Sequence, residues 1–232
     1  DIRPEPLGAA GTIMPNGEGV TRSIANVLNN HDQNSEIVEE HILRDVNKIV
    51  HPEYKYDRIV SQKLSDDNWE IYLYDNKNGR VPLSQCGSGI KTILHIVSTF
   101  NILAESFGSP IENSIFLLEE IENSLHPKTQ RNLLSYIDAM IGYTSFCILA
   151  THSSICLDFF QGRDDVSFTN IFQTAGETQS RAVSAFADRT GVLDAIGVKA
   201  SDALHANCVI WVEGPSDRIY LKSIIEMMSD EG

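Results

Sequence analysis

The chain has 232 residues, of which 42% are hydrophobic and 22% are charged, proportions that are typical of a globular protein. Its 32 acidic and 18 basic residues give a net charge of -14, which argues against broad binding of nucleic acid, because phosphate binding needs lysine and arginine. No apolar run approaches the roughly 20 residues of a membrane span, and the first residues do not look like a signal peptide. We therefore expect a cytoplasmic protein with no membrane partner, in which any DNA contact is local, metal-mediated or made by parts absent from this sequence.

The first third of the chain predicts helices followed by a β-hairpin. A short helix is indicated from Val20 to Leu28, and apolar residues at helical spacing from Asn34 onward predict a second helix, which Pro52 ends. Two strand-like runs follow, Arg58 to Leu64 and Trp69 to Asp75, and a turn rich in asparagine and glycine comes after the second.

A glycine-rich stretch, Leu83 to Lys91, leads into a helix predicted from Ser88 to Phe107. Gly87 and Gly89 would let the backbone approach a ligand closely, and the unpaired amides of the first helical turn suit a phosphate group. A glycine-rich turn that only caps the helix is the alternative interpretation.

The most informative segment is an apolar run, Ile115 to Leu118, that ends in Glu119 and Glu120. Such a run is typical of a buried parallel strand, and ligands bind at the carboxyl ends of such strands. Two adjacent carboxylates are costly to bury unless a positive group, such as a metal-bound phosphate, lies there. The alternative is a solvated acidic turn before the next helix, which we expect from Pro127 to Ile141.

A second apolar strand, Thr144 to Ala150, ends in Thr151 and His152. A lone histidine after a strand is usually structural, but its place one strand and one helix after the carboxylate pair favours a functional role. Beyond it the signal weakens: Val166 to Gln173 is typical of an edge strand, and Ser184 to Ile196 is partly helical.

In this order and spacing, the three segments resemble the signature motif, the Walker B strand with its D-loop, and the switch histidine of ABC-type ATPases. The likeness is greatest with the branch shared by SMC, RecF and the overcoming-lysogenisation-defect (OLD) nucleases, where a Glu-Glu pair and an x-Glu-x-x-Leu-His-Pro turn often occur. The resemblance implies that Glu119 binds magnesium and orients its water, that Glu120 is the general base, and that His152 senses the γ-phosphate.

The resemblance further implies that Glu122 and Asn123 lie in the D-loop. It also implies that Ser88, with the amides near Gly87 and Gly89, acts on the nucleotide of the opposite subunit in a head-to-head dimer. Ser84 is the other candidate for the signature serine.

ABC-type heads normally carry a P-loop, Gly-x-x-x-x-Gly-Lys-[Ser/Thr], well before the signature motif, and this sequence contains none. The nearest glycine-rich stretch, Gly8 to Gly19, has no lysine to reach a phosphate. Because the sequence begins with Asp1, we interpret it as the C-terminal portion of a head whose P-loop lobe is missing or on another chain. The alternative is a protein that has lost ATP binding.

Near the end, an apolar strand from Cys208 to Val212 runs into Glu213 and Asp217. This resembles the opening of a Toprim domain, in which the two carboxylates would share a divalent cation. The second acidic motif of that fold, Asp-x-Asp, has no room before Gly232, so the unit is incomplete. The four cysteines are scattered singly and are expected to be reduced.

The expected fold is α/β: an ABC/SMC-like head in residues 1–206, with a mostly parallel sheet flanked by helices and a preceding hairpin, then a truncated Toprim βα unit in residues 207–232. The expected function is that of an ATP-gated, metal-dependent DNA nuclease of the OLD type in anti-phage defence, an ATP hydrolase fused to a Toprim endonuclease. It would use ATP and Mg²⁺, form at least a dimer through its heads, and bind DNA through the nuclease domain of the parent protein. A second defence-system subunit is a further expected partner. By itself the 232-residue chain is expected neither to hydrolyse ATP nor to cut DNA.

Two alternatives stay open. One is an ATP-binding structural or sensor subunit of a defence or repair complex, resembling SMC or RecF, without nuclease activity of its own. The other is an ordinary α/β protein whose motif matches are coincidental.

Overall fold

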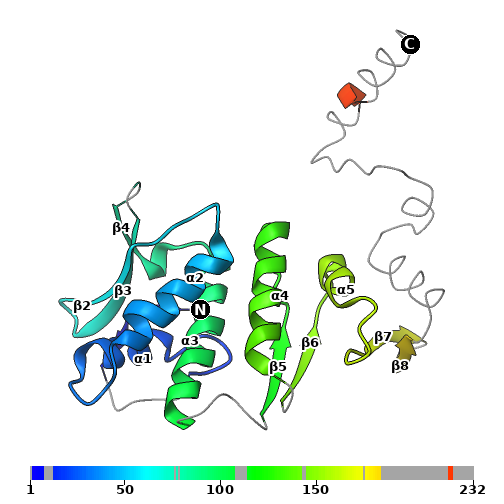
Figure 1. The fold of residues 1–232 in the computed structure, drawn as a ribbon, viewed down its shortest axis with the longest axis horizontal. Coiled ribbons are helices and arrows are strands. Elements are labelled where there is room, and N and C mark those ends of the chain that lie inside the picture. The colour runs from blue at the N-terminus through cyan, green and yellow to red at the C-terminus, as the bar shows by residue number, and fades with distance from the viewer. Residues whose placement is uncertain are drawn as a thin grey trace. The chain divides into compact units, whose positions relative to one another are not determined.

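The computed structural model describes residues 2–7, 13–75, 77, 79–107, 114–142, 145–174, 176–183 and 219–221. The chain divides into two compact units, Asp1–Arg163 and Asp164–Gly232, and each is considered by itself (Figure 1). The expected domain boundary between residues 206 and 207 lies outside the described residues and stays a prediction.

The first unit begins with helices at the predicted places. Helix α1 (Val20–Asn29) is confirmed, and the second predicted helix is present as a π-helical turn, η1 (Ile37–Ile42), that continues directly into α2 (Leu43–Val50). The Glu5 carboxylate caps α1, because it accepts hydrogen bonds from the backbone amides of Gly19 at 2.7 Å and Arg22 at 3.0 Å. A negative group at this end also matches the helix dipole.

An antiparallel sheet lies beside these helices (Figure 1). Its strands are β1 (Glu5–Pro6), β2 (Arg58–Lys63), β3 (Asn68–Asp75) and β4 (Gly79–Pro82). β2 pairs with β3 over its whole length, which confirms the predicted hairpin, while β1 and β4 pair with different stretches of β3. A short 3₁₀ turn, η2 (Leu83–Gln85), connects this sheet to the next helix.

The second half of the unit contains a parallel strand pair with helices. β5 (Ile115–Glu119) pairs in parallel with β6 (Phe146–Ala150), so that Glu119 lies opposite Ala150. Helices α3 (Ser88–Phe107) and α4 (Pro127–Ile141) have the predicted bounds, and α5 (Ser154–Phe160) was not predicted. α4 packs against both α2 and α5, and one hydrophobic core joins the helices to the inner side of the strands.

Among the described residues, nothing covers one face of the β5–β6 pair. Ile115 lies opposite Phe146 and Leu117 lies opposite Ile148, and these four side chains are 61–73% exposed. Parallel strands are normally covered on both faces, so this apolar face is unusual for the architecture.

In the second unit, the described residues form an antiparallel strand pair, β7 (Phe168–Thr174) and β8 (Glu177–Val183), followed by a helical turn at residues 219–221. β7 confirms the predicted strand, whereas β8 was not predicted. The expected parallel pairing is present in β5–β6, but the sheets are mixed: in the part of the chain that the structure describes, the pairings of β1 to β4 and of β7 with β8 are antiparallel. In β2–β3, β3–β4 and β7–β8 short turns join consecutive strands, and such turns force antiparallel pairing. In this same part, no helix is both long enough and apolar enough to span a bilayer.

Candidate functional site

The carboxylate pair lies where β5 ends. Glu119 is the last residue of the strand, and the Glu120 amide still donates a hydrogen bond to the Ala150 carbonyl at 2.9 Å before the chain turns away. Both glutamates are exposed. Glu120 has a φ of 47°, a left-handed backbone conformation that is unfavourable for a residue with a side chain. Backbone strain of this kind often marks a functional position.

Asn123 and His152 face the two oxygens of the Glu120 carboxylate. Asn123 Nδ2 donates a hydrogen bond to Glu120 Oε2 at 2.8 Å, and His152 Nε2 lies 3.7 Å from Glu120 Oε1. The His152 side chain is 85% exposed and that of Glu120 is 46% exposed, so the cluster is open to a ligand from solvent. The structure therefore brings together three residues that were singled out from three positions in the sequence.

A second set of contacts ties the loop after β5 to the loop after β6. Glu122 Oε1 accepts hydrogen bonds from Thr151 Oγ1 at 2.5 Å and from the His152 backbone amide at 2.9 Å. Gln130, in the first turn of α4, accepts from Ser153 Oγ at 2.9 Å. No roles were predicted for Thr151, Gln130 or Ser153, although polar residues after neighbouring parallel strands are a signal that points to this edge.

The glycine-rich turn before α3 contacts the same loop. A Cβ atom on Gly89 would lie 2.7 Å from the Ser124 carbonyl oxygen and 2.8 Å from Leu125 Cδ2, whereas a Cβ on Gly87 would have nothing within 4 Å. Gly89 is thus required by contacts within the chain. The predicted ligand contacts of both glycines stay predictions.

The two candidate signature serines have different surroundings. Ser84 donates a hydrogen bond from its hydroxyl to the carboxylate of Glu70, which is only 3% exposed. Ser88 is exposed and is the first residue of α3. Ser88 is thus the more exposed of the two residues, and which of them is the signature serine stays a prediction.

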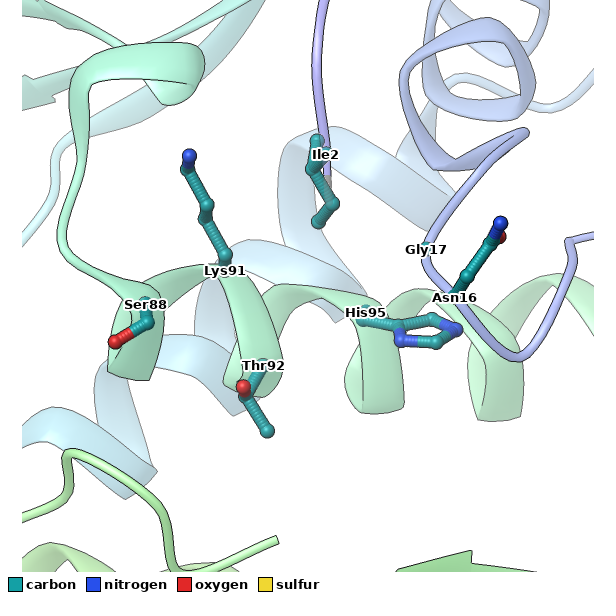
Figure 2. Close-up of a pocket in the computed structure, with 7 residues that line it drawn as sticks. All are labelled: Ile2, Asn16, Gly17, Ser88, Lys91, Thr92 and His95. Atoms are coloured by element: carbon teal, nitrogen blue, oxygen red, sulfur yellow. The ribbon is translucent and has the colours of Figure 1, made fainter.

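Ser88 also lines a small pocket on the surface of α3, which is shown in Figure 2. The side chains of Lys91, Thr92 and His95 line it from the same helix, and Ile2, Asn16 and Gly17 line it from the N-terminal segment. Burial lowers the pKa of His95, and a hydrogen bond with the Met14 backbone partly opposes this shift. The pocket was not predicted from the sequence.

The donor set at the strand end suits magnesium in company with a phosphate. Exposed carboxylate oxygens are ligands that Mg²⁺ accepts, and this ion usually binds one or two carboxylates together with substrate phosphates and water. Within the described ranges there is no cluster of three or more His, Cys, Asp or Glu side chains able to hold a metal by themselves. Glu213 and Asp217, the predicted metal ligands of the second site, lie outside the described residues.

Comparisons with known proteins bear on this arrangement. A family model described as an AAA ATPase domain matches residues 18–157. The fold is similar to that of an Smc head domain with a coiled coil and joint from Pyrococcus yayanosii, with a TM-score of 0.52, 14% identity, and coverage of 69% of this chain and 29% of that one. An Smc head with an extended coiled coil, bound to the C-terminal domain of ScpA, from Pyrococcus furiosus has a TM-score of 0.48 and 15% identity, with coverage of 69% and 38%. The chain thus spans less than a third of the first of these structures, and no curated protein matches it.

Proposed function

Because the chain belongs to the AAA ATPase domain family, we propose that it supplies the hydrolytic part of an ATPase head, with the end of β5 as the site of ATP hydrolysis. The observation that carries the proposal is the geometry of Glu120. One of its carboxylate oxygens is held by Asn123 at 2.8 Å and the other lies 3.7 Å from His152 Nε2. A carboxylate that is oriented in this way and still exposed is suited to take a proton from an attacking water molecule.

The neighbouring groups have complementary roles in this proposal. Glu119 holds Mg²⁺ together with the phosphates of ATP, and the ion when bound neutralises the charge that develops on the phosphoryl group. Asn123 keeps the Glu120 carboxylate from rotating, and the exposed His152 side chain contacts the γ-phosphate. These roles need the groups to be positioned before ATP arrives, and the hydrogen bonds around the turn supply that order.

In this proposal the phosphate-cradling P-loop lies outside the given sequence, whose 232 residues contain no such motif. The uncovered face of β5 and β6 supports this view. Ile115, Leu117, Phe146 and Ile148 offer the kind of apolar surface that a further layer of an α/β head would cover. In the same proposal, Ser88 and the amides near Gly87 and Gly89 act on the nucleotide of a second head, so that the working unit is at least a dimer.

The finer proposal is an ATP-gated nuclease of the OLD type in anti-phage defence. Its support is the sequence resemblance at Glu213 and Asp217, which would hold a divalent cation in a Toprim domain that acts on DNA. The net charge of -14 favours a second candidate, in which the chain belongs to an ATP-binding structural or sensor subunit that does not itself bind DNA. A magnesium-dependent cut in a DNA plasmid by the full-length protein, lost on Glu213→Gln, would separate the two.

The decisive experiment compares ATP turnover by the full-length protein with that of Glu120→Gln. We expect turnover to fall by at least about a hundredfold, since general base catalysis typically contributes 10²- to 10⁴-fold, while ATP binding is retained. Glu36→Gln is the matched control, because Glu36 is an exposed carboxylate that lies far from the motifs in the sequence. This variant should leave turnover unchanged. Unchanged turnover in Glu120→Gln would show that the carboxylate pair is structural and would overturn the proposal.

A further inference from the structure

Two side-chain bridges fasten the loop that carries His152, one to the turn after β5 and one to the first turn of α4. In one, the Glu122 carboxylate accepts hydrogen bonds from the Thr151 hydroxyl at 2.5 Å and from the His152 backbone amide at 2.9 Å. In the other, Gln130 accepts from the Ser153 hydroxyl at 2.9 Å. Of the two bridges, the one from Glu122 reaches His152 itself.

Among the described residues, one oxygen of the Glu122 carboxylate accepts hydrogen bonds and the other does not. Its Oε1 atom takes both hydrogen bonds, whereas Oε2 is buried and has no hydrogen-bond partner among the described residues. A buried carboxylate oxygen without a donor costs free energy, so this residue is a poor choice for stability alone. Such a group calls for another explanation, and its contacts with the His152 loop provide one.

The turn that contains Glu122 also orients Glu120. The Asn123 amide donates to the Glu120 carbonyl at 3.2 Å, and the Asn123 side chain holds the Glu120 carboxylate. The same turn therefore fixes the Glu120 carboxylate through Asn123, and it fixes the His152 backbone through Glu122. Because the His152 side chain is 85% exposed, little besides its backbone decides where the imidazole lies.

We propose that Glu122 is a positioning residue that holds the His152 imidazole beside Glu120 through the Thr151 hydroxyl and the His152 amide. The proposal rests on the proposed ATP hydrolysis at the end of β5 and adds a residue that touches neither nucleotide nor water. Loss of Glu122 leaves the Glu119 side of the nucleotide site in place but lets the His152 loop, and with it the proposed contact with the γ-phosphate, move. Hydrolysis therefore slows while ATP binding persists.

The kinetic test compares Glu122→Ala with Glu122→Gln in the full-length protein. Glu122→Ala should lower kcat at least about tenfold, because small displacements of a positioned group cost up to a hundredfold, and should leave KM for ATP within about twofold. Glu122→Gln keeps an oxygen acceptor and should recover part of kcat. Glu36→Ala, which removes an exposed carboxylate, is the matched control and should behave as wild type.

A double-mutant cycle tests the path through Thr151. Thr151→Val keeps the shape of the side chain and removes the hydroxyl donor. If both residues act through one contact, the double variant Glu122→Ala, Thr151→Val is no slower than Glu122→Ala alone. Additive losses in kcat would overturn the proposed path. Should Glu122→Ala fail to fold, Thr151→Val tests the path alone: it should lower kcat without raising KM for ATP, and an unchanged kcat would overturn the path.

A third measurement needs no ATP. Hydrogen–deuterium exchange of the 232-residue chain should be faster at residues 151–153 in Glu122→Ala than in wild type, with the exchange of α3 unchanged. Unchanged exchange at 151–153 would overturn the positioning role even if Glu120→Gln abolishes turnover. Conversely, faster exchange together with full turnover in Glu120→Gln would remove the proposed function and leave the loop contact as structural.

Discussion

The first turn of α3 touches the loop after β5 at Gly89, where an added Cβ would lie 2.7 Å from the Ser124 carbonyl oxygen. A backbone oxygen in a fixed turn cannot move aside cheaply, so Gly89→Ala should lower the free energy of unfolding by about 1–3 kcal/mol, the usual cost of overpacking. Urea denaturation of the chain measures this. Gly87→Ala is the control, because a Cβ there has nothing within 4 Å. Equal losses at Gly87 and Gly89 would contradict the contact with Ser124.

Glu120 has a strained backbone, with a φ of 47°. We predict that Glu120→Gly leaves the free energy of unfolding unchanged or raises it by up to about 1 kcal/mol, because glycine relieves a left-handed conformation that costs roughly 1–2 kcal/mol. The same variant should abolish ATP turnover by the full-length protein. Glu119→Gly is the matched comparison. It lies within β5, so glycine should lower stability by roughly 0.5–1 kcal/mol. If Glu120→Gly is the less stable of the two variants, the backbone at Glu120 is not strained and the prediction is wrong.

Much of the fold and of the strand-end cluster could be predicted because it depends on local patterns. The apolar run of β5 and the glycines before α3 gave bounds close to those observed, and the structure brings Glu120, Asn123 and His152 together at the place that the motif order implies. Contacts that depend on the register between distant strands could not be predicted. The hydrogen bond between Glu122 and Thr151 is one such contact, because it needs β5 and β6 to end side by side.

Glu70 shows why periodicity alone is a limited guide. Glu70 is a charged residue within β3, yet it is only 3% exposed. The carboxylate tolerates burial because the Ser84 hydroxyl and the Ile71 amide donate hydrogen bonds to it. The serine donor could not be assigned from the sequence, since Ser84 lies 14 residues away in the turn before α3.

His95 predicts a pH dependence of stability. Burial lowers the pKa of His95, so below the ordinary value of about 6.5 the unfolded chain binds a proton that the folded chain resists. The contribution to stability is therefore present above that value and is lost as the pH falls. We expect the decrease in the free energy of unfolding between pH 7.5 and 5.5 to be smaller in His95→Gln than in wild type. The exposed His31, changed to glutamine, is the control. Identical pH profiles for wild type and His95→Gln would contradict the effect of burial.

The contrast between Ser84 and Ser88 gives the last prediction. Ser84→Ala removes a hydroxyl donor from the buried Glu70 carboxylate, so the free energy of unfolding should fall by about 1.5–3 kcal/mol, the usual value of a hydrogen bond to a charged group. Ser88→Ala removes an exposed hydroxyl and should leave stability within about 0.5 kcal/mol of wild type.

The loss of ATP turnover should follow the opposite order, with the larger loss in Ser88→Ala. At a temperature where all variants are folded, Ser88→Ala should slow ATP hydrolysis by the full-length protein at saturating ATP, because Ser88 is the hydroxyl that a nucleotide on a second head could reach. Ser84→Ala should keep its turnover, because its hydroxyl is already engaged by Glu70. Slow hydrolysis in Ser84→Ala with normal hydrolysis in Ser88→Ala would assign the signature role to Ser84 and not to Ser88. It would also require the Glu70 contact to open when nucleotide binds.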